Sequence, residues 1–139
     1  MTGTASFAAL LGRLLLAAIF LMSGFGKLAA PTATIAYIAS SGGMPFPSIA
    51  YAGAVIVEIG FSIALVFGFH TRFVAVVMTL FALATAFAFH AHFDDKNQTI
   101  HFMKNIAIAG GFLQVAAFGG GMFSLDARRA RRSASLGRY

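Results

Sequence analysis

Four long apolar runs constrain this chain more strongly than any other feature of its sequence. They extend over about residues 7–28, 48–69, 73–91 and 102–118. An α-helix rises 1.5 Å per residue, so about 20 apolar residues cross the hydrocarbon core of a bilayer, which is about 30 Å thick. Each run is close to that length. The sequence therefore predicts an all-α integral membrane protein, a four-helix bundle with up-down topology.

The composition supports a membrane protein and excludes several kinds of site. Of the 139 residues, 59% are hydrophobic and 10% are charged, whereas a soluble domain has about 25% charged residues. The chain contains no cysteine. This excludes a disulfide, a thiol nucleophile and a cysteine-ligated iron–sulfur or zinc site. We expect one transmembrane domain over residues 1–127, followed by a basic tail over residues 128–139.

The segments between the runs predict short connections. Residues 31–47, PTATIAYIASSGGMPFP, contain three prolines and a Gly-Gly pair, which argue against one continuous helix. A short interfacial turn around Ile35–Ala39 is the most structure we expect there. The stretch FGFHTRF predicts a tight hairpin, and the glycines of GGGMFSLD predict the end of the last helix.

The basic residues predict the orientation in the membrane. An even number of spans places both termini on one side. With both termini in the cytoplasm, the inner face carries Arg13, Arg72 and the five arginines of the tail, and the outer face carries Lys27, Lys96 and Lys104. Cytoplasmic segments carry the excess of Lys and Arg, so both termini are predicted to be cytoplasmic. The basic tail is then a topogenic segment that contacts anionic lipid, and no nucleic-acid partner is expected.

Glu58 is the most unusual residue of the second run, whose residues 51–69 read YAGAVIVEIGFSIALVFGF. It lies about ten residues from either end of the run, so it should be near the middle of the membrane. A charge there costs about 2.5–3.5 kcal/mol on insertion scales. We therefore expect this carboxylate to face the interior of the bundle, either as a proton carrier in a functional site or as a structural ion-pair member.

A helical wheel places most polar groups of each run on one face, which predicts a polar seam inside the bundle. Lys104 is the favoured cation near Glu58 on the outer side, and Arg13 is left open. Lys27 is expected to extend along its stem to the interface. The candidate ligand-binding residues on the seam are Lys104, Asn105, His90, Arg13 and Tyr51.

The histidines give only weak support for a metal or haem. His90 and His92 are two residues apart, so on a helix they face about 200° apart and cannot chelate one ion. His92 and His101 flank the predicted outer loop without a carboxylate-rich spacing around them. We expect no metal site.

Five blocks in order make the chain similar to the DoxX family of membrane proteins: GRLLLAAIFLMSGFGKL, GGMPFP, VEIGFSIALVFGFHTR, HFMKNIAIAGGFL and GGGMFSLD. The resemblance covers roughly residues 10–127 and implies a four-helix protein of the bacterial inner membrane. The family is named for a subunit of a terminal quinol oxidase, and relatives are linked to quinone-coupled sulfur oxidation and oxidative-stress complexes. The family's recurrent polar positions correspond to Arg13, Lys27, Glu58, Arg72, Lys104 and Asn105.

Three functions are compatible with these features. The first is a quinone- or quinol-interacting subunit, linked to respiratory or oxidative-stress redox chemistry, that receives electrons from a partner protein. Quinone is the only cofactor expected. The second is a scaffold without catalytic activity that docks a partner. The third is a transporter of protons or a small solute, for which four helices are few and a homodimer would be expected.

Overall fold

The computed structural model describes residues 2–41 and 43–136, and this part of the chain is helical with no strand. The last three residues, Arg138 of the predicted basic tail among them, lie outside the described part. The helices are α1 (Gly3–Ala29), α2 (Pro31–Ser41), α3 (Pro47–Val55), the π-helical segment η1 (Ile56–Phe61), α4 (Ser62–Phe67), α5 (Thr71–Phe89), α6 (Lys96–Phe118) and α7 (Leu125–Leu136).

Three helical stretches are long and apolar enough to cross a membrane. They are α1 with 27 residues, the continuous stretch Pro47–Phe67 with 21, and α5 with 19. Helix α6 has 23 residues, but its first half is rich in polar side chains, and α6 is not among the three. An all-helical fold is confirmed for the described residues, and the four-helix bundle with its fourth span stays a prediction.

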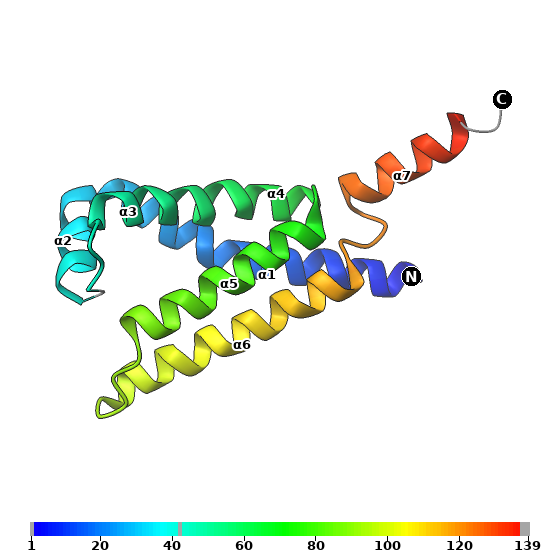
Figure 1. Ribbon diagram of the computed structural model, residues 1–139. Coiled ribbons are helices and arrows are strands. Elements are labelled where there is room, and N and C mark those ends of the chain that lie inside the picture. Colours follow the sequence, from blue (N-terminus) through cyan, green and yellow to red (C-terminus); the bar gives the residue numbers. More distant parts are fainter. Residues whose placement is uncertain (1, 42, 137–139) are drawn as a thin grey trace.

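The long helices pack as two pairs. Helix α1 lies against the α3–η1–α4 stretch, and α5 forms a hairpin with α6. Figure 1 shows that the α5–α6 hairpin diverges from α3 and α4 toward the end of the molecule where α2 lies. The core between the pairs combines small side chains such as Ala17, Ala75 and Ala82 with Phe20 and other large ones. Small residues let membrane helices approach closely.

Two elements differ from the sequence-based expectation. Residues 31–41 form the helix α2, of 11 residues, where only a short turn was expected; Pro31 occupies its first position, where its missing N–H costs nothing. Helix α6 begins at Lys96 rather than near residue 102, because the side chain of Asp95 accepts a hydrogen bond from Asn97 N at 2.8 Å and caps the helix.

Residues 128–136 of the basic tail belong to α7, which is fastened to the α4–α5 turn. The carboxylate of Asp126 accepts hydrogen bonds from His70 N at 2.8 Å, and from Thr71 N and Thr71 Oγ1 at 2.7 Å each. It therefore caps the N-terminus of α5 from another helix. Burial opposes ionisation of Asp126, but these hydrogen bonds outweigh it and hold the pKa of the carboxyl below its ordinary value of 3.8.

Candidate functional site

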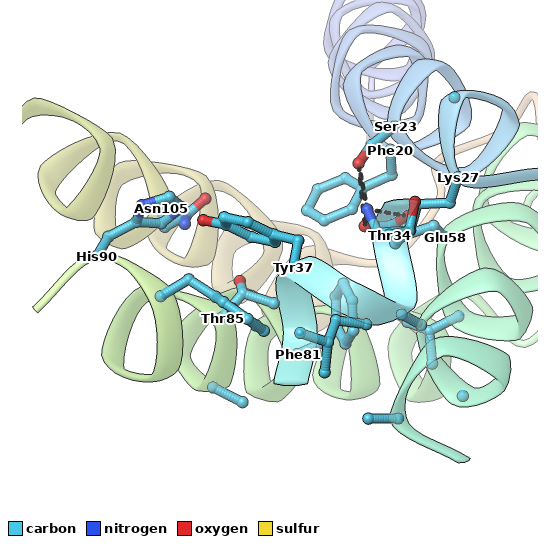
Figure 2. A pocket seen from close by; sticks show the side chains of 18 of the residues that line it. Phe20, Ser23, Lys27, Thr34, Tyr37, Glu58, Phe81, Thr85, His90 and Asn105 are labelled. Carbon is cyan, nitrogen blue, oxygen red and sulfur yellow. Dashed lines mark hydrogen bonds and ion pairs between the residues drawn. The ribbon is translucent and has the colours of Figure 1, made fainter. Parts of the chain in front are cut away.

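The site is a cavity of about 810 Å³ bounded by residues of α1, α2, α3, η1, α5 and α6. Most of its lining is apolar, including Phe20 and Phe81. Figure 2 shows polar side chains toward its two ends, with Ser23, Lys27 and Glu58 at one and His90 and Asn105 at the other. We call these the Glu58 end and the His90 end. Ligand pockets are commonly apolar cavities of 300–1,000 Å³ with a few placed polar groups.

The Glu58 end is built around a buried ion pair. Lys27 Nζ lies 2.9 Å from Glu58 Oε2 and donates to Oε1 at 2.9 Å. Ser23 Oγ donates to the same Oε1 at 3.1 Å and accepts from Lys27 Nζ at 2.8 Å. The Glu58 side chain is 5% exposed and that of Lys27 is 24% exposed. The three groups thus satisfy most of one another's hydrogen-bonding capacity, and only the buried Glu58 Oε2 accepts no hydrogen bond.

This pairing corrects the predicted partner of Glu58. The cation is Lys27, which was expected to extend to the interface, and not Lys104. Ser23 and Lys27 are four residues apart on α1, so they share a face of the helix. That face is the one turned toward Glu58, and burial of the carboxylate makes the ion pair more favourable than extension of the lysine into water.

Two local features bring α1 and Glu58 together. A Cβ atom at Gly24 would lie 2.6 Å from Ile59 Cγ1 and 3.1 Å from Glu58 Cβ, so only glycine permits this close approach. Glu58 also belongs to η1, the π-helical turn in the middle of its span. Such wide turns inside α-helices occur frequently at functional sites.

The His90 end is formed by α2, α5 and α6. His90 Nδ1 lies 2.7 Å from Gln98 Oε1, and the rings of His90 and His101 stack at 5.2 Å. Lys104 Nζ lies 3.1 Å from His101 Nδ1. Tyr37 of α2 also lines the cavity and stacks on Phe89, with the ring centroids 5.7 Å apart.

The predicted site residues fall into two groups. Glu58, His90, Lys104 and Asn105 all line the cavity. Tyr51 is not part of the lining, but its hydroxyl donates to Lys27 O at 3.3 Å and so braces the end of α1.

The side chain of Arg13 lies outside the cavity and forms no hydrogen bond or ion pair with Glu58. Its side chain is fully buried. Nη1 donates to Leu65 O at 2.9 Å and Val66 O at 3.3 Å, and Nη2 donates to Phe123 O at 2.6 Å. Arg13 therefore connects α1 to the C-terminus of α4 and to the segment after α6, and it is not among the residues that line the cavity.

Five polar residues of the cavity were not among the proposed site residues, namely Ser23, Lys27, Thr34, Tyr37 and Thr85. The spacing of Ser23 and Lys27 was a usable signal, because two polar residues four apart define one face of a helix. Tyr37 gave no signal, since its segment was not expected to form a helix. Among the described residues, no three His, Asp or Glu side chains are placed to hold a metal ion.

Comparison with known proteins is consistent with this architecture. The family model DoxX matches residues 8–91. Inner membrane protein YqjF of Escherichia coli (strain K12) is 36% identical over 117 residues, which cover 84% of this chain and 88% of the relative. Inner membrane protein YphA of the same organism is 38% identical over 124 residues, which cover 86% and 88%. No solved structure matches.

These relatives and the three candidate spans identify a multi-pass protein of the bacterial inner membrane. The family match extends over α1, α2, the α3–η1–α4 stretch and α5, and so includes Lys27 and Glu58. The chain belongs to the DoxX family.

Proposed function

We propose that the protein binds a quinone or quinol in the cavity and acts as a subunit in respiratory or oxidative-stress redox chemistry. The observation that carries this proposal is the arrangement of polar groups at two ends of an aromatic-walled, largely apolar cavity. A quinone has the matching chemistry: an apolar ring, two oxygens on opposite sides of it, and solubility in lipid.

Each part of the cavity then has a role. Phe20 and Phe81 flank the ring, and His90, Lys104 and Asn105 hold one oxygen. Glu58 at the other end is the candidate proton carrier, since conversion between quinone and quinol moves two protons and two electrons. A carboxylate held in mid-span by a lysine is a functional candidate by default.

Electrons must come from a partner protein or a bound cofactor, because the chain has no cysteine to hold an iron–sulfur cluster. The protein is thus proposed as a subunit rather than a complete oxidoreductase. The membrane arrangement that suits this role has α6 as the fourth span and both termini in the cytoplasm. Support for it comes from the α5–α6 hairpin and from the excess of arginine at the end that carries both termini.

The first experiment is extraction of quinone from the detergent-purified protein, detected by absorbance, followed by titration with a short-chain quinone. Ala84 lines the cavity, so Ala84→Phe should block binding. Ala107 is exposed on α6 outside the lining, so Ala107→Phe is the matched control and should bind as wild type does. Lys104→Ala and Glu58→Gln should each weaken binding about tenfold, which is about 1.4 kcal/mol.

Two results would overturn the proposal. One is the absence of quinone binding by the wild-type protein, and the other is binding that Ala84→Phe leaves unchanged. Proton flux into liposomes that depends on a solute and is lost in Glu58→Gln would instead establish the transporter function.

A further inference from the structure

The two ends of the cavity differ in how much of their hydrogen-bonding capacity is already used. At the Glu58 end, Ser23, Lys27 and Glu58 bond one another, and Glu58 Oε2 is buried from solvent. At the His90 end, the only hydrogen bond of Lys104 within the described residues is to His101, and the side chains of Asn105 and Tyr37 make none there. The accessible, unused polar groups are therefore at the His90 end.

The hydrogen bond of His90 fixes which of its ring nitrogens is free. Its partner is the carbonyl oxygen of the Gln98 side chain, at 2.7 Å. That oxygen can only accept, so His90 Nδ1 carries the hydrogen and donates it. In the neutral ring, Nε2 is then an acceptor without a hydrogen. His90 lines the cavity, so this lone pair is the acceptor that its ring has for a ligand.

Two neighbouring side chains of α6, Lys104 and Asn105, supply hydrogen-bond donors. Lys104 is a donor only, with three N–H groups of which one points to His101 Nδ1. The Asn105 amide adds two N–H donors and one acceptor oxygen. A ligand oxygen at this end can therefore meet donors from α6 and acceptors from His90 and Asn105.

We infer that the His90 end selects a ligand oxygen that donates and accepts at once, namely a hydroxyl on the ring. This inference rests on the proposed function and specifies the form of the ligand that binds best. A phenolic hydroxyl accepts from Lys104 or Asn105 and donates to His90 Nε2. A quinone carbonyl or an aryl ether can accept but cannot donate, so it leaves His90 Nε2 without a hydrogen. The reduced, dihydroxy ring is accordingly bound more tightly than the oxidised ring.

The test uses a long-chain 4-alkylphenol and its methyl ether, two probes that differ by one donated hydrogen and undergo no redox change in a binding assay. Isothermal titration of wild-type protein in micelles should give a dissociation constant for the phenol that is about three- to tenfold lower than for the ether, as expected for one neutral hydrogen bond. His90→Phe keeps a ring against His101 and should bind both probes equally. His90→Gln restores an acceptor and should recover part of the preference.

The outcomes separate the inference from the proposed function. Equal affinity of wild type for both probes, with Ala84→Phe abolishing both, would overturn the hydroxyl selection and leave the cavity as the quinone site. An unchanged preference in His90→Phe would also overturn the assignment to His90. If neither probe nor quinone binds, the proposed function itself fails. Size-exclusion profiles and helical circular dichroism of each variant establish that it is folded before it is titrated.

Discussion

Replacing Arg13 by lysine should destabilise the protein strongly without affecting ligand binding. The guanidinium is fully buried and holds three backbone carbonyls, two at the C-terminus of α4 and one after α6. These segments are far apart in the sequence, and Arg13 links each of them directly to α1. The position also tolerates little rearrangement, since a Cβ at Gly68 would lie 2.4 Å from Arg13 Nη1.

The size of the effect follows from the geometry of the two terminal nitrogens. One serves Leu65 O at 2.9 Å and Val66 O at 3.3 Å, and the other serves Phe123 O at 2.6 Å. A lysine has a single ammonium nitrogen and cannot occupy both positions. It therefore leaves at least one of these carbonyls, which are buried or partly buried, without its donor. A hydrogen bond to a charged group contributes about 1.5–3 kcal/mol, so Arg13→Lys should lower the free energy of unfolding by about 2–3 kcal/mol.

The measurement is unfolding of the purified protein in mixed micelles by titration with dodecyl sulfate, followed by circular dichroism. Arg72 is exposed, so Arg72→Lys is the matched control and should stay within about 0.5 kcal/mol of wild type. Quinone affinity of Arg13→Lys should be unchanged, because Arg13 is outside the cavity lining. Equal stability of the two variants would refute the structural role of the three Arg13 hydrogen bonds. A selective loss of quinone affinity would instead return Arg13 to the ligand site.

Three further predictions concern other contacts. Gly24→Ala should lower the free energy of unfolding by about 1–3 kcal/mol, because the new Cβ would lie 2.6 Å from Ile59 Cγ1. Gly110→Ala has open space around the new Cβ, so this control should be neutral or slightly stabilising in the same unfolding assay. Lys27→Met leaves the buried Glu58 carboxylate without its cation and should lower the free energy of unfolding by about 3 kcal/mol. The double variant with Glu58→Gln should recover most of this loss of stability. Additive losses in the double variant would contradict the pairing. Asp126→Asn should cost about 1 kcal/mol at neutral pH. Because the folded-state pKa of Asp126 is lowered, the wild-type advantage is present above about pH 3.8 and should disappear as pH falls through the lower folded value; an advantage that persists at the acid end would exclude this linkage.

The sequence predicted the long helices well because the bilayer imposes one length and one polarity on them. The expected spans at about 48–69 and 73–91 differ by only one or two residues from Pro47–Phe67 and Thr71–Phe89 at each end. Helix α2 and the early start of α6 were missed for a common reason. Both lie outside the strongly apolar runs, where the start of a helix depends on Pro31 and on the cap from Asp95 rather than on hydropathy.

The candidate site was predicted in part, since four of the six proposed residues line one cavity. A helical wheel gives the direction of a side chain about its own axis, but it does not give the distance between two helices. That distance depends on Gly24, which lets α1 approach Glu58, and on the π-helical turn that carries Glu58. Neither the close approach at Gly24 nor the π-helical turn leaves a periodic pattern in the sequence. Lys27 could therefore not be ranked above Lys104 as the partner of Glu58.

Burial explains why the two polar ends of the cavity are built so differently. A carboxylate in mid-span must be neutralised within the protein, because no water is available to solvate it. Lys27 and Ser23 do this, and in doing so they use the groups that could otherwise hold a ligand. At the other end of the cavity, Lys104 and Asn105 need no such compensation, since the lysine is exposed and the amide is only partly buried. The ion pair therefore suits proton exchange, and the less buried end suits recognition of a ligand. Substitutions at the His90 end should accordingly change which ligand is bound, whereas Lys27→Met should lower the stability of the folded protein.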